Sequence, residues 1–298
     1  MKKSIVNCAM IGHGYWGRLV EKYILKHPGF NLIDIYTSSS LASVDDFVSS
    51  TNANAYFICS PKSTHYDYCK FLLLRGKDVF CEKPLVSDID MTSELYRISE
   101  CKESILFVDY VYTYSETVEK IKESLSNQSK ILSIEMGMEQ FGRFYSDSDV
   151  METLGVHLLA ILEALFPFFN YSIKGVYDFS TKISDNPTEK VIVLDVNDIP
   201  VFLRMTLNSE MKKRYIRILT PDKLLSANMV NSYSTCYFVE NETGYNTNTQ
   251  TLNLLEDNNL FKVTDEFYKA IISRNNVTNK RIGYKVEKLL SDIKLYNR

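Results

Sequence analysis

The sequence predicts an α/β chain of two domains. The first is an N-terminal Rossmann domain with a doubly wound parallel sheet, and the second is an α+β domain with a large, mostly antiparallel open sheet. Near the start of the chain an apolar segment runs directly into a glycine-rich turn, and strand-like and helical segments then alternate. In the second half, strand-like segments follow one another with few helices between them. We therefore expect a dinucleotide-binding domain over residues 1–107 and a substrate-binding and oligomerisation domain over residues 108–298.

Length and composition agree with this division. A chain of 298 residues with 45% hydrophobic and 24% charged side chains is typical of a globular protein with two cores. Its 34 basic and 37 acidic residues give a net charge of −3, which provides no basic field for nucleic acid. The longest apolar stretch, residues 158–169, is too short for a bilayer, and the early glycines interrupt any signal peptide. We interpret the protein as cytoplasmic, without nucleic-acid or membrane partners.

The six cysteines show no C-x-x-C spacing and no histidine at zinc-finger distance. We therefore expect no metal site and no disulfide bond. Cys8, Cys59 and Cys81 lie in apolar, strand-like segments, where a reduced cysteine behaves as a small hydrophobic residue.

The glycine-rich turn follows an apolar strand that ends at Ile11. It consists of Gly12, His13, Gly14, Tyr15, Trp16 and Gly17. Gly12 permits a tight turn, Gly14 lets backbone amides approach a pyrophosphate, and Gly17 lets the next helix lie close to the strand. A bare G-x-G-x-x-G is weak evidence and can be a structural glycine turn, but its place between strand and helix predicts a dinucleotide site.

The second strand, residues 31–36, is followed by hydroxyl side chains. A fold that prefers NAD usually carries a carboxylate about 20 residues beyond the glycines, where it binds the ribose 2′-hydroxyl. Here that position is Thr37, followed by Ser38 and Ser39. No carboxylate would repel a 2′-phosphate, but no arginine follows to bind one. The segment slightly favours NADP over NAD, and the alternative is a polar turn that does not touch the ribose.

The alternation continues along the chain. A short helix is expected near residues 43–50, a strand over 53–60 that ends at Pro61, and a helix over 66–74. A further strand, residues 78–81, runs into Glu82, Lys83 and Pro84. Ligands bind parallel sheets at the carboxyl ends of the strands, so the glycine turn, residues 60–65 and residues 82–84 should converge.

Three motifs, in this order, resemble the Gfo/Idh/MocA family. They are Ile-Gly-His-Gly-Tyr-Trp-Gly at residues 11–17, Ser-Pro-Lys-Ser-Thr-His at 60–65 and Gly-Lys-Asp-Val-Phe-Cys-Glu-Lys-Pro-Leu at 76–85. Residues 107–122 resemble the family's crossover into the second domain, Leu-Gly-Val-His at 154–157 its catalytic helix and residues 266–295 its closing helices. Members are two-domain NAD(P)-dependent oxidoreductases that act mostly on sugars, inositols and nucleotide-linked sugars. The resemblance covers essentially the whole chain and narrows the type of reaction more than the substrate.

Lys83 and His157 are the candidate catalytic residues. By pattern alone, Lys83 could donate a hydrogen bond to a substrate hydroxyl or could be a surface lysine in a turn. His157 lies early in a helical segment of about residues 153–166, where a histidine is often only an interior or capping group. The resemblance implies that Lys83 bridges the nicotinamide ribose and the substrate, before a proline bond that is often cis, and that His157 is the general acid/base.

The remaining site residues follow partly from the resemblance and partly, for Tyr110, Tyr112 and Arg143, from their place in crossover and loop segments that could reach the cleft. The resemblance places His65 near the nicotinamide ribose, where its alternative role is to cap the helix from Tyr66. The predicted cofactor contacts further include Ser60, Pro61, Glu82 and Pro84. The predicted substrate contacts, besides Lys83 and His157, are Tyr110, Tyr112, Arg143 and Thr153.

Thr153 is a departure from the family's pattern, which usually has an aspartate four positions before the histidine. A carboxylate one helical turn away would orient the imidazole and stabilise its charged form, whereas threonine can only form hydrogen bonds. Three alternatives follow. The site uses Lys83 and His157 without the aspartate, or Tyr110, Tyr112 or Glu152 assists, or catalysis has been lost.

Four strand-like segments in the second half predict the antiparallel sheet: residues 131–140, 190–195, 201–208 and 214–220. The polar segments 178–189 and 233–250 are expected to be loops or hairpin tips. An open sheet must cover its outer face, and an apolar face would do so by self-association. We therefore expect a homodimer or homotetramer that forms through this sheet, as the family resemblance also implies.

Together these features predict an NAD(P)-dependent oxidoreductase that transfers a hydride between the nicotinamide and a sugar-like, including a nucleotide-linked, alcohol or ketone. Two alternatives stay open. One is a non-catalytic, cofactor-sensing regulatory protein with the same fold, which Thr153 favours. The other is a reductase of an imine or conjugated double bond, for which a paired aspartate and histidine are less needed.

Overall fold

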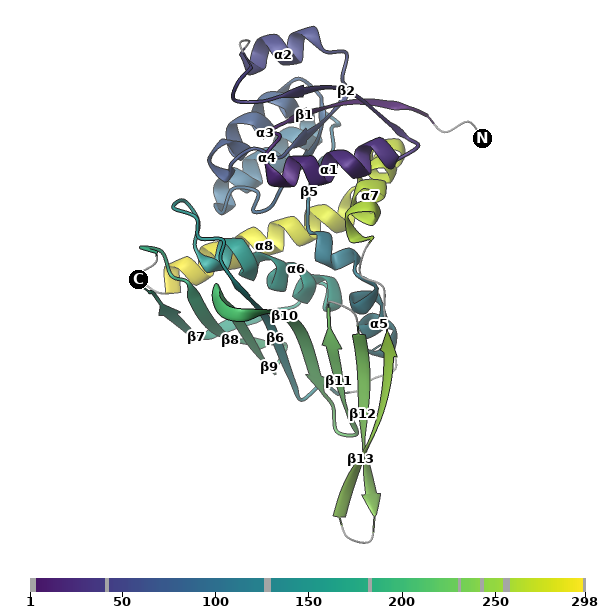
Figure 1. Ribbon diagram of the computed structural model, residues 1–298, viewed down its shortest axis with the longest axis vertical. Coiled ribbons are helices and arrows are strands. Elements are labelled where there is room, and N and C mark those ends of the chain that lie inside the picture. The colour runs from purple at the N-terminus through teal and green to yellow at the C-terminus, as the bar shows by residue number, and fades with distance from the viewer. Residues whose placement is uncertain are drawn as a thin grey trace. The chain divides into compact units, whose positions relative to one another are not determined.

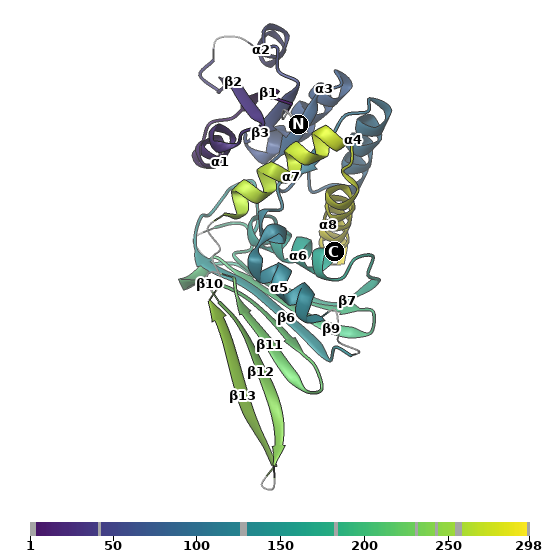
Figure 2. The ribbon, with the colours of Figure 1, turned by 90° about the vertical axis from the view of Figure 1, so that its right-hand side faces the viewer.

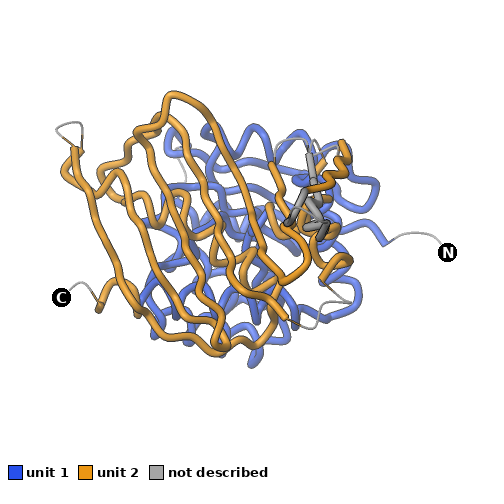
Figure 3. The backbone as a smooth tube through the Cα atoms, turned by 90° about the horizontal axis from the view of Figure 1, so that it is seen from below, with its two compact units in different colours: residues 1–111, 259–291 blue, residues 112–258, 292–298 orange. Residues whose placement is uncertain are grey.

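The computed structural model describes residues 4–40, 43–125, 130–181, 184–229, 232–241, 244–253 and 258–296. The chain forms two compact units, coloured separately in Figure 3. Met1–Val111 and Asn259–Ser291 form the first unit, and Tyr112–Asn258 with Asp292–Arg298 forms the second. Within the described part of the chain, no helix has both the length and the apolar character that a membrane span requires.

The first unit contains a five-stranded parallel sheet in the order β2-β1-β3-β4-β5 (Figure 1). Its strands are β1 (Val6–Ile11), β2 (Phe30–Tyr36), β3 (Ala55–Ile58), β4 (Asp78–Cys81) and β5 (Leu106–Val108). Every residue of β3, β4 and β5 is buried, and apart from Asp78 at the start of β4 all of them are apolar. The order reverses between β1 and β3, as in a doubly wound sheet, so the predicted Rossmann architecture is confirmed.

Helices connect these strands. They are α1 (Tyr15–Lys26), α2 (Val44–Ser50), α3 (His65–Leu74) and α4 (Ile89–Cys101). Helix α3 contacts α4, whereas α1 contacts α7 (Asn259–Ser273), which comes from the far end of the chain. The cysteines predicted to act as small hydrophobic residues, Cys8, Cys59 and Cys81, are buried and reduced.

Helix α7 covers the sheet with one aromatic side chain, Phe267. Its ring centroid lies 5.9, 5.3, 5.5 and 5.6 Å from the rings of Phe30, Phe57, Phe80 and Phe107, respectively. Those four rings come from β2, β3, β4 and β5, so a single residue of α7 packs against four of the five strands.

Helix α8 (Val277–Tyr296) closes the edge of the sheet. The amide of Asn279 accepts a hydrogen bond from the Val108 nitrogen and donates one to the Val108 oxygen, both at 2.8 Å. Asn276 Nδ2 donates to the Leu106 oxygen at 2.5 Å. These side chains satisfy the backbone groups of β5 that a sixth strand would otherwise pair with.

The position of these two helices differs from the expected division at residues 107 and 108. That division assigned all of residues 108–298 to the second domain, whereas contacts group Asn259–Ser291 with the Rossmann sheet. The physical reason is that the edge of β5 and the aromatic face of the sheet both need a cover, and the chain supplies it only at its end.

The second unit contains an eight-stranded sheet in the order β13-β12-β11-β10-β6-β9-β8-β7. Strands β6 and β9 run parallel and the other neighbours are antiparallel, so the predicted mostly antiparallel open sheet is confirmed. Figure 2 shows α5 (Glu116–Leu125) and α6 (Val156–Leu165) over one face of it. The strands are β6 (Ser133–Phe141), β7 (Tyr171–Phe179), β8 (Glu189–Val196), β9 (Ile199–Thr206), β10 (Asn208–Leu219), β11 (Lys223–Asn228), β12 (Ser232–Asn241) and β13 (Gly244–Asn253).

The four predicted strands of this half correspond to β6, β8, β9 and β10. The polar segment 178–189 falls largely between β7 and β8, as expected. Residues 233–250, expected to be irregular, instead form most of the long hairpin of β12 and β13 (Figure 2). The many polar residues of this segment hide the strands from sequence reasoning, because they give no alternation of apolar and polar residues.

We predict that Phe267→Ala lowers the free energy of unfolding by about 3–5 kcal/mol, because it removes a buried ring that contacts four strands. Urea denaturation measures this. The control is Ile272→Ala on the same helix, where the side chain is 50% exposed and the expected change is within about 1 kcal/mol. Equal losses in both variants would contradict the role assigned to Phe267.

Candidate functional site

The predicted cofactor residues of the first unit lie at one edge of its sheet. The first residue after each of four strands donates a backbone hydrogen bond to the neighbouring strand. These bonds fix the carboxyl ends of the strands relative to one another. Four hydrogen bonds do this: Gly12 to Tyr36 (2.8 Å), Cys59 to Ile11 (2.8 Å), Glu82 to Ile58 (3.0 Å) and Asp109 to Cys81 (2.9 Å), each from nitrogen to oxygen. The structure thus brings together the glycine turn, residues 59–65, residues 82–84 and Asp109.

Two glycines of the turn are required by the fold. Gly12 has φ of +94°, and a Cβ there would lie 2.5 Å from the Ser60 nitrogen. A Cβ on Gly17 would lie 2.5 Å from the Gly12 oxygen. At Gly14, by contrast, no atom lies within 4 Å of such a Cβ, so the fold itself places no steric demand there. Gly14 therefore keeps the backbone open for something outside the chain.

The start of α1 fits a pyrophosphate. Gly14 is the N-cap residue and contributes no side-chain cap, and the first turn carries no acidic residue. The amides at this helix end and the positive end of the helix dipole are therefore available to an anion. The His13 side chain forms a hydrogen bond of 2.8 Å between its Nε2 and Glu21 Oε2. Tyr15 and Trp16 are exposed beside it, so the residues present fit a dinucleotide.

The hydroxyl segment after β2 forms a compact turn. The Thr37 nitrogen donates to Ser40 Oγ at 3.0 Å, and the Ser40 nitrogen donates to the Thr37 oxygen at 2.9 Å. Thr37 Oγ1 and Ser39 Oγ are 2.8 Å apart. Because Gly12 pairs with Tyr36, this turn, which includes Ser38, directly neighbours the glycine turn. It offers hydroxyl groups and no carboxylate.

His65 connects two loops of the site. Its Nε2 lies 3.0 Å from the Ser60 oxygen and its Nδ1 lies 2.9 Å from the Pro84 oxygen. It begins α3 rather than preceding it, so it does not cap a helix from Tyr66 as the alternative role required. Burial lowers the pKa of the imidazole, although both carbonyl contacts favour the charged ring. His65 therefore positions the loop with Pro61 against the loop with Lys83.

The loop after β4 is also fixed from α8. The peptide bond between Lys83 and Pro84 is cis, as the family resemblance implied. The Leu85 nitrogen donates to Glu287 Oε1 at 3.0 Å. Lys83 is half-buried, between residues whose backbones are held on both sides. Such support limits where its ammonium group can lie.

A buried pair of carboxyl groups lies beside Lys83. Burial raises the pKa of Glu82 well above its ordinary value, repulsion from Asp109 adds to this, and the Lys83 charge opposes it. Burial raises the pKa of Asp109 to about 6, while the hydrogen bond with Glu82 and the Lys83 charge lower it. The buried pair therefore takes up a proton more readily than two exposed carboxyl groups would. Sequence reasoning missed Asp109, although its place directly after β5 was a usable signal.

In the second unit, the structure brings His157 and Tyr112 together. His157 is the second residue of α6 and is 7% exposed. Its ring centroid lies 4.8 Å from that of Tyr112, with an interplanar angle of 86°, so the rings meet edge to face. The centroid of the Tyr112 ring also lies 5.2 Å from the guanidinium carbon of Arg214. Sequence reasoning missed Arg214, because a single arginine in a strand carries no pattern.

Thr153 lies in a π-helical turn (Met151–Gly155) that precedes α6. The expected helical segment of about residues 153–166 is present as α6, but its first turn, which contains Thr153, is π-helical rather than regular. Thr153 Oγ1 donates to the Asp149 oxygen at 2.8 Å. Glu152 Oε1 accepts from Lys294 Nζ at 2.8 Å. Thr153 and Glu152 thus both have hydrogen-bond partners of their own. Of the residues proposed to assist His157, Tyr112 is the one whose ring contacts the imidazole.

Tyr110 and Arg143, the two remaining predicted substrate contacts, differ in exposure. Tyr110 belongs to the first unit and is 1% exposed, and burial raises the pKa of its hydroxyl well above the usual value. A side chain so enclosed presents little surface to a substrate. Arg143 is exposed and follows β6.

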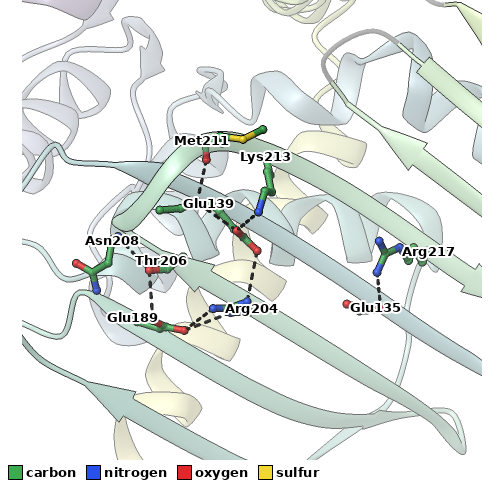
Figure 4. Close-up of polar contacts among 10 residues, drawn as sticks. Glu135, Glu139, Glu189, Arg204, Thr206, Asn208, Met211, Lys213 and Arg217 are labelled. Carbon is green, nitrogen blue, oxygen red and sulfur yellow. Dashed lines mark hydrogen bonds and ion pairs between the residues drawn. The ribbon is translucent and has the colours of Figure 1, made fainter.

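The sheet of the second unit has one face without α5 and α6, and this face is not simply apolar. Figure 4 shows ion pairs that cross its strands, in which Arg204 bonds Glu189 at 2.9 Å and Lys213 bonds Glu139 at 3.3 Å. Arg217 pairs with Glu135 at 3.2 Å. The exposed aromatic residues Tyr177, Phe179 and Phe202 are on the same face.

Comparison with known proteins agrees with this geometry. Residues 6–110 match the model of an oxidoreductase family with an NAD-binding Rossmann fold, GFO_IDH_MocA. Human biliverdin reductase A is 29% identical over 110 residues, which cover 33% of this chain and 37% of that protein. An uncharacterized oxidoreductase of Streptococcus pneumoniae is 25% identical over 141 residues, which cover 43% of this chain and 38% of that protein.

Two solved structures match nearly the whole chain. UDP-N-acetylglucosamine 3-dehydrogenase from Acidithiobacillus ferrooxidans has a TM-score of 0.84 at 16% identity and covers 97% of this chain and 96% of its own. A 3-ketoreductase variant from Actinomadura kijaniata, in complex with TDP-benzene and NADP, has a TM-score of 0.84 at 12% identity and covers 98% of both chains. At these identities the likeness shows the fold.

The matched residues, 6–110, define a dinucleotide-binding unit of the oxidoreductase class. They match the Gfo/Idh/MocA family model, which confirms the resemblance found from the three sequence motifs. The matched segment spans only 37–38% of the curated relatives' length, and the activity of the whole chain is taken up as a proposal.

We predict that Gly14→Ala weakens NADPH binding by at least about tenfold while leaving the free energy of unfolding nearly unchanged. The reason is that a Cβ at residue 14 meets no atom of the chain but would meet a bound pyrophosphate. Gly12→Ala should instead destabilise the fold by about 2 kcal/mol or more. Fluorescence titration with NADPH and urea denaturation separate the two effects. Unchanged NADPH affinity in Gly14→Ala would refute the site.

We predict that Asp109→Asn stabilises the protein more at pH 8 than at pH 4. The folded pKa of Asp109, about 6, exceeds the ordinary 3.8, so its stabilising contribution is complete below 3.8 and lost as the pH rises through 6. The loss is about 3 kcal/mol. Urea denaturation at several pH values measures it, with Asp90→Asn, an exposed residue in the first turn of α4, as control. Parallel pH profiles for wild type and Asp109→Asn would contradict the raised pKa of Asp109.

Proposed function

We propose that the chain is an NAD(P)-dependent oxidoreductase that transfers a hydride between the nicotinamide and the carbinol or carbonyl carbon of a sugar-like substrate, including nucleotide-linked sugars. The observation that carries the proposal is the convergence of strand ends in the first unit. The glycine turn, the Ser60 loop held by His65, and Lys83 with its buried carboxyl pair all lie at one sheet edge. Parallel sheets bind their ligands at this edge.

Each proposed role follows from the chemistry of the residue. Bound NAD(P) would supply or accept the hydride at C4 of its nicotinamide. Lys83 donates a hydrogen bond to the substrate oxygen, and its positive charge stabilises that oxygen as the hydroxyl loses its proton. Negative charge on Glu82 or Asp109 would attract the ammonium group of Lys83. His157 takes the proton from the hydroxyl during oxidation and returns it during reduction.

The cofactor preference is proposed to lean towards NADP. The turn after β2 offers the hydroxyl groups of Thr37 and Ser39, which can donate hydrogen bonds to a 2′-phosphate. It carries no carboxylate that would repel the phosphate and bind the 2′-hydroxyl of NAD instead.

We also propose a homodimer or homotetramer that forms through the sheet of the second unit. The exposed aromatic side chains of Tyr177, Phe179 and Phe202 provide apolar area, and burial of such side chains drives association. The ion pairs of Arg204, Lys213 and Arg217 are already satisfied within the chain, so they can enter an interface without new partners.

A second candidate function is a regulatory protein that binds the cofactor without catalysis. Thr153 favours this candidate. Its hydroxyl bonds the Asp149 oxygen, and it stands four positions before His157, where the family usually has an aspartate. A third, reduction of an imine or conjugated double bond, needs Lys83 and the cofactor but not a strong base. Turnover assays with NADPH and compounds of each class separate the three.

We predict that Lys83→Ala lowers kcat/KM on a sugar substrate by roughly 10²–10⁴-fold, the loss typical of a removed proton-transfer or hydrogen-bonding group. Absorbance of the nicotinamide band measures turnover, and NADPH fluorescence titration measures binding. Lys77→Ala is the matched control, because Lys77 precedes β4 at the opposite end and bonds the Ala53 oxygen at 2.8 Å. Tight NADPH binding without turnover of any sugar in the wild type would support the regulatory alternative.

A further inference from the structure

Arg214 of β10 is a buried cation in the second unit. It alternates along the strand with buried Ile216 and Ile218, so its side chain lies on the apolar face that faces the helices. Only 9% of the residue is exposed. Charged side chains in such positions are rare unless a counter-charge or a ligand meets them.

The chain compensates this charge incompletely. Arg214 Nη2 donates to Gln140 Oε1 at 3.3 Å, and its guanidinium lies over the Tyr112 ring. Its Nε is buried and has no hydrogen-bond partner in the described part of the chain. Within the same described residues no carboxylate forms an ion pair with it, whereas Arg204 and Arg217 on the opposite face each pair with a glutamate.

An amide oxygen and an aromatic ring recover only part of the hydration that a buried guanidinium loses. Burial accordingly lowers the pKa of Arg214, and the neighbouring Tyr112 is what opposes it. An unsatisfied N–H of a charged group in a buried position costs free energy in the absence of a ligand. A negatively charged ligand would remove that cost.

Arg214 lies close to His157, so a negatively charged group bound at Arg214 would be near the proposed acid/base. The Tyr112 ring contacts both the guanidinium and the imidazole of His157, at 5.2 and 4.8 Å. The two distances together set an upper limit on the separation of the cation and the proposed acid/base. One small substrate can span such a separation, with its reacting hydroxyl at His157 and a charged group at Arg214.

We propose that Arg214 determines substrate specificity by binding a carboxylate of the substrate, so that the sugar oxidised or reduced at His157 is a sugar acid. The inference rests on the proposed oxidoreductase function. A planar carboxylate matches the donor fork of a guanidinium. A single cation suits one negative charge, whereas a phosphate dianion calls for more donors than Arg214 and Gln140 supply.

Matched substrate pairs test the inference. Initial rates with the nicotinamide cofactor are compared for glucose and glucuronate, and for UDP-glucose and UDP-glucuronate, with glucose 6-phosphate as the phosphate probe. In the wild type the acids should have the higher kcat/KM. Arg214→Met should reduce the ratio of acid to neutral sugar by at least about tenfold, mainly through KM, and Arg214→Lys should restore part of it. Arg97→Met, an exposed arginine of the first unit, is the control.

A binding measurement makes the result independent of turnover. Glucuronate should raise the thermal midpoint of the wild type more than glucose does, and the difference should vanish in Arg214→Met. If this difference is seen but no sugar turns over, the anion site stands and the oxidoreductase proposal fails. Turnover of neutral sugars with equal ratios in wild type and Arg214→Met overturns the anion site and leaves the oxidoreductase. Preference for glucose 6-phosphate overturns the carboxylate assignment. If Arg214→Met does not fold, Arg214→Lys is compared with the wild type instead, and it should show a smaller loss in the ratio of acid to neutral sugar.

Discussion

The edge strand β5 imposes the constraint on which the first unit depends. Its backbone groups need partners, and the aromatic face behind it needs a cover. Asn279 of α8 and Asn276 directly before it provide the partners, and Phe267 of α7 provides the cover. Glu287 extends this support to the loop that carries Lys83. The two ends of the chain are therefore both required to fix the carboxyl edge at which the cofactor is proposed to bind.

Buried charge marks the proposed site in each unit. In the first unit the carboxyl groups of Glu82 and Asp109 are buried together beside Lys83, and in the second Arg214 is buried beside the ring that touches His157. Elsewhere in the second unit, by contrast, Arg204 and its neighbours form ion pairs on an exposed face. Burying an incompletely paired charge opposes folding, so such groups point to chemistry rather than to stability.

The sequence allowed prediction of those parts of the fold that depend on local pattern. Strands buried on both faces, such as β3 and β4, appear as continuous apolar runs, and Gly12 and Gly17 reveal the turn that their contacts require. What could not be predicted depends on residues distant in sequence. The cover of β5 by α8, the pairing of Asp109 with Glu82 and the isolation of Arg214 each arise only when separate segments meet. The π-helical turn at Thr153 likewise has no signature in spacing.

If Arg214 binds a carboxylate of the substrate, one explanation covers two unusual features of the second unit: the absence of an aspartate before His157 and the buried charge of Arg214. The position that would supply a negative charge beside His157 holds Thr153, whose hydroxyl bonds a backbone oxygen, and Glu152 is engaged by Lys294. The unit also contains a buried positive charge that no carboxylate in the described part of the chain neutralises. A substrate that carries its own carboxylate would neutralise Arg214 and bring negative charge close to the imidazole as it takes up a proton. The missing aspartate and the unpaired arginine would then be parts of a single arrangement, in which the substrate supplies the charge that the chain lacks.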